Sequence, residues 1–389
     1  MPATEHHTRR DHTSHPKTGR SGADHDQIVE QLCARVAEIP GDVREIAARE
    51  LALLAPLLHG PARDAALAAS VARLVGLGGL ERLLDDAEVS EVLVNAGEVW
   101  VERSGRLERA GGIDPVELDA VLERILAPLG RRLDHAHPMV DARLADGSRL
   151  CAVIAPVAVD GTVVSIRRTT GHRLGLDAFA SPAEMALLHE LLERRLNIVI
   201  SGGTSTGKTS LLAALLGTLG DTERLVVVED TAELDPPVGH LLRLEARPAT
   251  PDGPPPIGLD ALVRTALRLR PDRLIVGEVR GPEVLALMQA LNTGHDGSLT
   301  TVHANSANDA LIRLETLTIQ TATAWPLVAV RDHLARSTDI VVQLTRTSTA
   351  RRRIHEIIEV VSADQHLIST RALATAGVVT ADVIRDRRR

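Results

Sequence analysis

The spacing of apolar residues divides the chain into regions of different character. From Gln27 to Leu84 apolar side chains recur every three or four positions, as Ile28, Leu32 and Val36 do, and this period is typical of amphipathic helices. Pro40-Gly41 interrupts the first run. We therefore predict a helical region over residues 27–84.

Beyond this region the period changes to the alternation that is typical of strands. Asn95-Ala96-Gly97 separates two such strands and predicts a hairpin, and Asp146-Gly147 predicts a second turn. Together with one helix, these strands predict a small α+β domain over residues 85–170. The predicted elements are the strands Val89–Val94 and Glu98–Glu102, the helix Leu118–Leu129, two strands within Asp141–Ile154, and the strand Thr162–Arg167.

The remainder of the chain alternates short apolar strands with helices, which is the pattern of a parallel sheet. A linker is predicted at residues 171–184, and Ser181 is expected to cap a helix that begins at Pro182. Residues 235–258 contain seven prolines, so they are expected to form a loop or an edge strand. We predict an α/β domain over residues 185–389 with a mainly parallel sheet.

Composition limits the classes of function. The chain has no Tyr, one Phe and two Trp, so it has few side chains on which single-stranded bases could stack. Its net charge of −8 also argues against a nucleic acid, with its chain of phosphates, as the main partner. The two cysteines make no disulfide framework, and no apolar run approaches the ~18 residues of a membrane span. We expect a cytoplasmic protein. Residues 1–26 are polar, with five histidines, and we expect a disordered tail there rather than a metal site.

A glycine-rich motif between a predicted strand and a helix provides the clearest chemistry. The string fits G-x-x-x-x-G-K-[ST], a loop whose amides and following helix N-terminus hold phosphate oxygens. Lys208 is expected to reach the β- and γ-phosphates of ATP, and Thr209 to ligate Mg²⁺. A chance glycine turn is the alternative. The expected nucleotide-binding residues are Gly202, Gly203, Thr204, Ser205, Thr206, Gly207, Lys208, Thr209 and Ser210.

Carboxylates follow two of the later strands. Ligands bind at the carboxyl edge of a parallel sheet, so these side chains are candidates for catalysis. Glu278 is expected to hold Mg²⁺ through water, and Glu233 to orient or deprotonate the attacking water. Glu229 and Asp230 would support them. The alternative is that some of these carboxylates only cap the segments that follow.

Two histidines come after the third predicted strand of this domain. His303 is expected near the nucleotide end of the next strand, where it could sense the γ-phosphate. A lone histidine is more often a packing or surface residue, and the spacing of His295 and His303 is not that of a metal site.

Several strings of the sequence resemble those of a known family. Four ordered strings match the Walker A, Asp, Walker B and His boxes of the type II/type IV secretion ATPase superfamily, and two upstream strings resemble its CpaF-like branch, the Flp (tight-adherence) pilus assembly ATPases. Ser205 departs from the branch, which has Gly there. The four boxes are Ser201–Ser210, Val228–Leu234, Arg270–Gly281 and Asn292–Asn305, and the upstream strings are Asp141–Arg149 and Ser165–Arg168.

The resemblance implies a RecA-like ATPase domain, a hexamer, and domain rotations that drive a membrane platform protein. It also implies that Arg149 and Arg167, and less strongly Arg143, touch the γ-phosphate from the N-terminal domain. The alternative is that these arginines make surface ion pairs worth ~0–1 kcal/mol.

We therefore predict an ATPase that powers pilus assembly or secretion from the inner face of the cell membrane, with an inner-membrane platform protein as partner. A nucleic-acid translocase or a DNA-transfer type IV secretion ATPase is the alternative, although no stable nucleic-acid partner is expected. A small-molecule kinase lacks an evident acceptor site. A scaffold without catalysis conflicts with the intact Lys208, Thr209 and Glu278.

Overall fold

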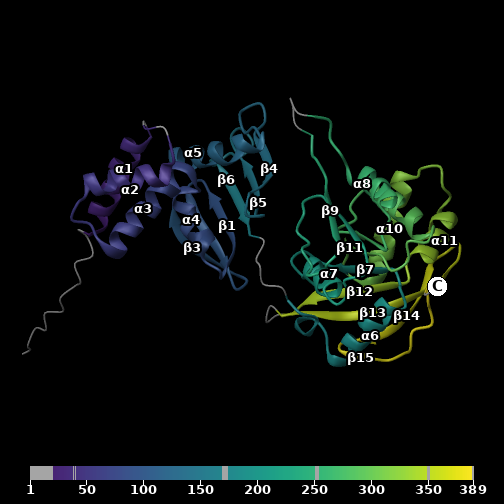
Figure 1. Cartoon of the computed structure of the whole chain (residues 1–389). Coiled ribbons are helices and arrows are strands. Elements are labelled where there is room, and N and C mark those ends of the chain that lie inside the picture. Colours follow the sequence, from purple (N-terminus) through teal and green to yellow (C-terminus); the bar gives the residue numbers. More distant parts are fainter. Residues whose placement is uncertain are drawn as a thin grey trace, which may run out of the picture. The chain divides into compact units, whose positions relative to one another are not determined.

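The computed structural model describes residues 21–37, 39, 41–168, 174–249, 254–347 and 351–387. The chain divides into two compact units, residues 1–144 with 149–168 and residues 145–148 with 169–389 (Figure 1). Each unit has its own sheet and is described separately. No helix of the described part is long and apolar enough to cross a membrane.

Three helices open the first unit: α1 (Ser21–Val36), α2 (Val43–Leu54) and α3 (Gly60–Val75). They pack on one another through buried side chains that include Leu32, Leu51 and Ala66. Helix α1 begins at Ser21, six residues before the expected start, so the tail predicted for residues 1–26 is wrong for residues 21–26. The rest of that tail lies outside the described residues.

The first sheet is antiparallel throughout, with the order β3-β2-β1-β6-β5-β4. One face packs on helix α5, which Asp114 caps, in a core that includes Val92, Leu118 and Ile166. Both predicted hairpins are present. The elements of this sheet region are η1 (Gly78–Leu80), α4 (Glu81–Asp85), β1 (Val89–Asn95), β2 (Glu98–Arg103), β3 (Arg106–Gly112), α5 (Pro115–Leu126), η2 (Ala127–Leu129), β4 (Met139–Arg143), β5 (Arg149–Val153) and β6 (Val163–Arg167).

The second unit is built on a nine-stranded sheet with the order β15-β14-β13-β12-β7-β11-β10-β8-β9. The six strands from β12 to β9 in this order are parallel, and β13 to β15 add an antiparallel extension. The predicted α/β fold class is confirmed. The strands are β7 (Ile198–Gly202), β8 (Leu225–Glu229), β9 (Leu241–Glu245), β10 (Arg273–Val276), β11 (Leu299–His303), β12 (Ile340–Arg346), β13 (Arg352–Ala363), β14 (Ile368–Thr375) and β15 (Val378–Val379).

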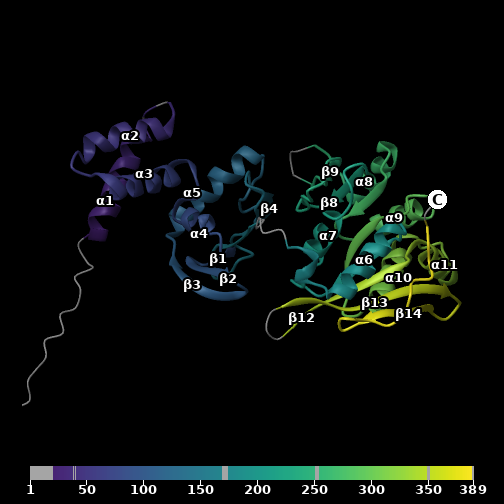
Figure 2. The same ribbon diagram turned by 60° about the horizontal axis from the view of Figure 1, so that its bottom comes forward.

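Helices cover both faces of this sheet (Figure 2). One core joins the sheet to α8–α11, and the other joins it to α6 and α7. Ser181 and Glu184 form the predicted capping box of α6, so the last three residues of the predicted linker are helical. The helices are η3 (Leu176–Ala178), α6 (Pro182–Glu193), α7 (Lys208–Leu216), α8 (Leu259–Ala266), η4 (Leu267–Leu269), α9 (Glu283–Leu291), α10 (Ala307–Thr321) and α11 (Leu327–Ser337).

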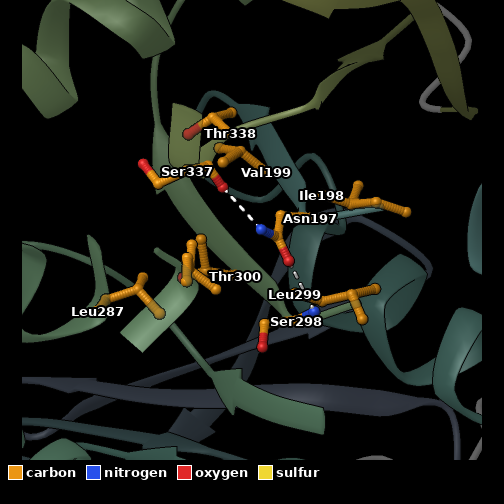
Figure 3. Close-up of a pocket in the computed structure, with 10 residues that line it drawn as sticks. Asn197, Ile198, Val199, Leu287, Ser298, Leu299, Thr300, Ser337 and Thr338 are labelled. Atoms are coloured by element: carbon orange, nitrogen blue, oxygen red, sulfur yellow. Dashed lines mark hydrogen bonds between the residues drawn. The ribbon is translucent and has the colours of Figure 1, made fainter. Parts of the chain in front are cut away.

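Asn197 fixes the amino end of the central strand β7 (Figure 3). Its side-chain amide donates to the carbonyl of Ser337 at 2.9 Å, and its Oδ1 accepts from the amides of Gly297 and Ser298 at 3.0 and 3.1 Å. A small cavity lies beside it, lined by residues such as Leu287 and Thr300. Because this cavity lies where β7 and β11 begin, it is at the opposite edge of the sheet from the glycine-rich loop.

Candidate active site

The glycine-rich loop joins the carboxyl end of β7 to the first turn of α7. Two of its residues are left-handed, Ser205 at φ +59° and Gly207 at φ +95°. The Thr206 hydroxyl donates to the carbonyl of Gly203 at 2.9 Å. A Cβ added to Gly202 would lie 2.6 Å from the Thr206 hydroxyl and 2.9 Å from the Leu344 carbonyl, so glycine is required there. This backbone curl, followed directly by a helix N-terminus, is an anion-binding arrangement.

Lys208 is the first residue of α7, and its side chain turns back over the loop. It is only 7% exposed, and its Nζ donates to the carbonyls of Gly202 and Gly203 at 3.1 and 3.0 Å. Burial lowers the pKa of Lys208, and the carboxylate of Glu278 acts against that shift. The ammonium group of Lys208 is thus held inside the loop, and the carboxylate of Glu278 provides an opposite charge after β10.

His303, the last residue of β11, lies between that ammonium group and Glu278. Its Nδ1 is 3.2 Å from Lys208 Nζ, and its Nε2 is 3.1 Å from Glu278 Oε1. Burial lowers the pKa of His303, with Glu278 opposing the shift and Lys208 adding to it. The ring is therefore neutral at neutral pH, and it can accept a hydrogen bond from Lys208.

Glu278 follows β10, and its two carboxylate oxygens differ. Oε2 accepts from Arg280 at 2.6 Å. Oε1 is buried and has no hydrogen-bond donor, because the His303 contact is close but not directed as a hydrogen bond. Such an orphaned carboxylate oxygen is a natural acceptor for a metal-bound water. Among the described residues, no group of three or more His, Cys, Asp or Glu side chains is arranged to hold a metal ion.

The carboxylates after β8 occupy different environments. Glu229 is 4% exposed and accepts from the amides of Glu233 and Leu234 at 3.2 Å each. Burial raises the pKa of Glu229 to about 7, and the two backbone hydrogen bonds oppose the rise. Glu229 thus holds the turn that carries Glu233. Glu233 and Asp230 are close enough to Arg280 to raise the pKa of its guanidinium, after the larger effect of Glu278.

Gln343 on β12 is a residue of this site that the sequence patterns did not single out. It is 4% exposed, its Oε1 accepts from the Ser201 hydroxyl, and its Nε2 donates to the Asn305 carbonyl at 3.1 Å. It therefore ties the strand before the glycine-rich loop to the segment after His303. Its only sequence signal was one polar residue inside the apolar run of a buried strand.

The structure brings Lys208, His303 and Glu278 together at the carboxyl edge of the sheet. His295 is not among them. Its Nδ1 lies 3.2 Å from the Ala290 carbonyl, in the turn before β11, at the opposite edge.

Three arginines of the first unit form a row across its sheet. The register pairs Arg143 with Arg149, and Arg149 with Arg167. Buried neighbours such as Leu150 and Ile166 alternate with them, so the arginines lie on the sheet face away from the core. Glu91 of β1 is the next residue in the row. The row therefore places three cations and one carboxylate side by side on this face of the sheet.

The buried parallel sheet, the curled loop and the lysine at the start of α7 define a P-loop NTPase. The model of the type II/IV secretion system protein family matches residues 73–383 of the chain. This chain belongs to that family and is a secretion-system ATPase.

Relatives from several organisms agree with this placement. A Mycobacterium tuberculosis protein named "Putative conjugal transfer protein" is 40% identical over 73% of this chain and 84% of its own length. The conjugal transfer protein TrbB of Rhizobium radiobacter is 32% identical over 71% of this chain and 85% of its own. The ATPase DotB of Yersinia pseudotuberculosis, 16% identical, covers 72% of this chain and 78% of its own with a TM-score of 0.53, and it supports the fold alone.

Proposed function

We propose that this protein hydrolyses ATP at the loop of residues 202–209 and that the hydrolysis powers a type IV secretion machine related to those of conjugal transfer. The observation that carries the proposal is the chain of contacts from Lys208 through His303 to Glu278. The relatives named for conjugal transfer support the choice of machine. The expectation of a Flp pilus motor therefore gives way to the secretion alternative.

Each residue of the loop region has a distinct role in this proposal. The amides of the loop and the helix N-terminus hold the β-phosphate, and Lys208 exchanges its bonds to the Gly202 and Gly203 carbonyls for phosphate oxygens. Mg²⁺ fits the site, because Glu278 has a buried oxygen without a donor and Thr209 lies in the first turn of α7. When bound, Mg²⁺ would neutralise charge on the phosphates. Thr209 would hold it directly and Glu278 through water.

Glu233 is the proposed group that orients the attacking water, because it lies on the turn that the buried Glu229 holds. A positioned carboxylate takes the proton as the water attacks. His303 contacts both Lys208 and Glu278, so a γ-phosphate drawn to Lys208 changes the surroundings of the ring. We propose that His303 reports the nucleotide state to the segment that follows β11.

Arg149 and Arg167 are the proposed source of extra positive charge in the transition state. Such a residue can raise the rate by ~10³–10⁵. The resemblance of the strings Asp141–Arg149 and Ser165–Arg168 to the CpaF-like branch supports this role, and the register places both arginines next to each other on one face of the first sheet. In this proposal the protein works as a hexamer on the cytoplasmic face of the inner membrane, next to a platform protein.

Assembly of a Flp pilus is a second candidate. The strings Asp141–Arg149 and Ser165–Arg168, which resemble the CpaF-like branch, favour it. Both candidates share the same chemistry and differ in what is moved.

Complementation of a strain that lacks the protein tests the proposal. Wild-type protein should restore transfer of a mobilisable plasmid or a secreted protein, and Lys208→Ala should not. The Flp alternative predicts restored surface pili without restored transfer. Restoration by Lys208→Ala would refute both. Mass measurement of the purified protein with Mg-ATP is expected to give six subunits.

A further inference from the structure

Two side chains from outside the four boxes lie against the last glycine of the loop. A Cβ built on Gly207 would be 2.8 Å from Cδ and 3.4 Å from Nε of Arg352, and 3.2 Å from the ring of Phe179. Arg352 is the first residue of β13, and Phe179, the only phenylalanine of the chain, follows η3. The arginine stem and the ring edge thus lie in contact distance of the backbone that begins α7.

This contact is part of the packing of the second unit. The Phe179 carbonyl accepts from the Ile354 amide at 2.9 Å, and both side chains are buried in the core on the α6–α7 face. Arg352 lies on the same side of β13 as Ile354, because residues two apart on a strand share a face. Arg353 is exposed on the opposite side.

The strand order places Arg352 on the opposite side of the central strand from the groups that are proposed to meet the γ-phosphate. Glu278 follows β10 and His303 ends β11, and both strands lie on one side of the central strand β7. Arg352 belongs to β13, two strands away on the other side of β7. In the proposed function the γ-phosphate lies against Lys208, His303 and Glu278, so the α-phosphate and ribose would leave the loop on the other side of β7. Arg352 lies on that side, beside Gly207.

We propose that Arg352 binds the nucleoside end of the nucleotide, at the α-phosphate and ribose, with Phe179 as the wall that orients its guanidinium. This inference rests on the proposed function of the loop. It assigns a ligand contact to the antiparallel extension of the sheet.

The test compares binding of Mg-ADP with binding of pyrophosphate, measured by titration calorimetry. Arg352→Met keeps the stem that packs on Gly207 and removes the charge. It should weaken ADP about tenfold, or about 1.4 kcal/mol, as expected for one charge-assisted hydrogen bond. Pyrophosphate, which occupies only the inner phosphate positions, should change by less than about twofold to threefold. Arg352→Lys should retain most of the ADP affinity.

Arg353→Met is the matched control, and both of its affinities should stay at the parental values. In turnover assays Arg352→Met should raise KM for ATP and leave kcat nearly unchanged, because the contact is equal in the ground and transition states. Thermal unfolding verifies that each variant is folded.

Three results would overturn the assignment: an unchanged ADP affinity in Arg352→Met, equal losses for ADP and pyrophosphate, or an equal effect of Arg353→Met. Lys208→Ala separates this inference from the proposed function. Lys208→Ala should abolish binding of both ADP and pyrophosphate, whether or not Arg352 contacts the nucleotide. If it does not, the loop itself is not the nucleotide site.

Discussion

The two sheets of this protein display their charges in different ways. The first sheet is antiparallel and packs one face on a core, so it can place charges along its strands, and three arginines lie side by side on its outer face. The parallel part of the second sheet is buried on both faces, so its functional charges gather where the strands end. There a lysine, a histidine and a glutamate touch one another. The row in the first sheet consists of three arginines followed by Glu91, and the strand ends of the second sheet offer a mixed and partly buried set of charges.

The two sets of charges respond differently to their surroundings. Like charges in a row repel one another, and a bound anion relieves that repulsion. Buried groups instead change their pKa, as Lys208 and Glu229 do, and partial burial lowers the pKa of His303. The following predictions test this contrast.

Removing one arginine from the first sheet should have the largest effect. We expect Arg149→Ala to lower kcat for ATP about 10³-fold, because a cation that stabilises the transition state is lost. Its unfolding free energy should change by less than about 1 kcal/mol, as is usual for a charged side chain outside the core. Phosphate-release kinetics and urea unfolding measure the two effects.

Arg109→Ala is the control for this change, since Arg109 lies on β3 of the same sheet and pairs with Glu98 at 2.8 Å. It should leave turnover within about twofold, as expected for an exposed ion pair. Loss of stability without loss of turnover in Arg149→Ala would show that the row is structural.

The pH dependence of stability tests the buried charges of the second sheet, because Glu229 is one of them. Its pKa of about 7 lies above the ordinary value of 4.5, mainly because of burial, with smaller contributions from the charges of Glu233 and Glu245. Stability from this group is complete below pH 4.5, and it is lost as the pH rises through about 7, since the folded state then carries a buried charge.

Glu229→Gln removes this dependence. Its unfolding free energy should match wild type near pH 5 and exceed it by about 2–3 kcal/mol at pH 8, from about 1.4 kcal/mol per unit of pKa shift. Denaturant titrations at both pH values measure the difference. The exposed Glu193→Gln should show no such gain, and a gain that is equal at both pH values would contradict the assignment.

Gln343 tests whether the strand tips of the second sheet depend on a buried amide. Gln343→Leu leaves the Ser201 hydroxyl and the Asn305 carbonyl without partners, which should lower stability by about 1–3 kcal/mol. We expect kcat to fall about tenfold because His303 is no longer positioned.

A double-mutant cycle with His303→Ala distinguishes positioning from mere loss of stability. The double variant should be no slower than the slower single variant, because both changes act on the same histidine. Fully additive losses would contradict this. Gln289→Leu, at an exposed position of α9, should leave turnover unchanged.

Ser205 should show the smallest effect. Its φ of +59° is a left-handed conformation that costs a non-glycine residue about 1–2 kcal/mol, and the greater chain entropy of glycine offsets part of the gain. Ser205→Gly should therefore raise stability by at most about 1 kcal/mol. Ser210→Gly, inside α7, should lower it by about 1 kcal/mol, and thermal unfolding of both measures the contrast.

Much of the fold could be predicted because its elements have periodic sequences. Both hairpins of the first sheet and the capping box of α6 follow from local patterns. Strand β3 could not be predicted, because all seven of its residues are exposed and show no alternation. The nine-stranded order depends on contacts between distant segments, which local periodicity does not encode.

The residues of the candidate site also divide into those that the sequence predicts and those that it does not. The loop residues, Glu278 and His303 lie in strings whose residue types carry their own chemistry. Gln343 and Arg352 lie in ordinary strands, and only the strand order brings them to the loop. Similarly, the raised pKa of Glu229 arises from burial and could not be inferred from its type.

The central claim is that the ammonium group of Lys208, held in the curl of residues 202–209, binds the triphosphate that is hydrolysed. Phosphate release from Mg-ATP by purified wild-type and Lys208→Ala proteins tests it most directly. We predict steady turnover by wild type and a loss of at least about 10²-fold in the variant, the size expected for one key electrostatic donor. Turnover by Lys208→Ala at the wild-type rate would contradict the account.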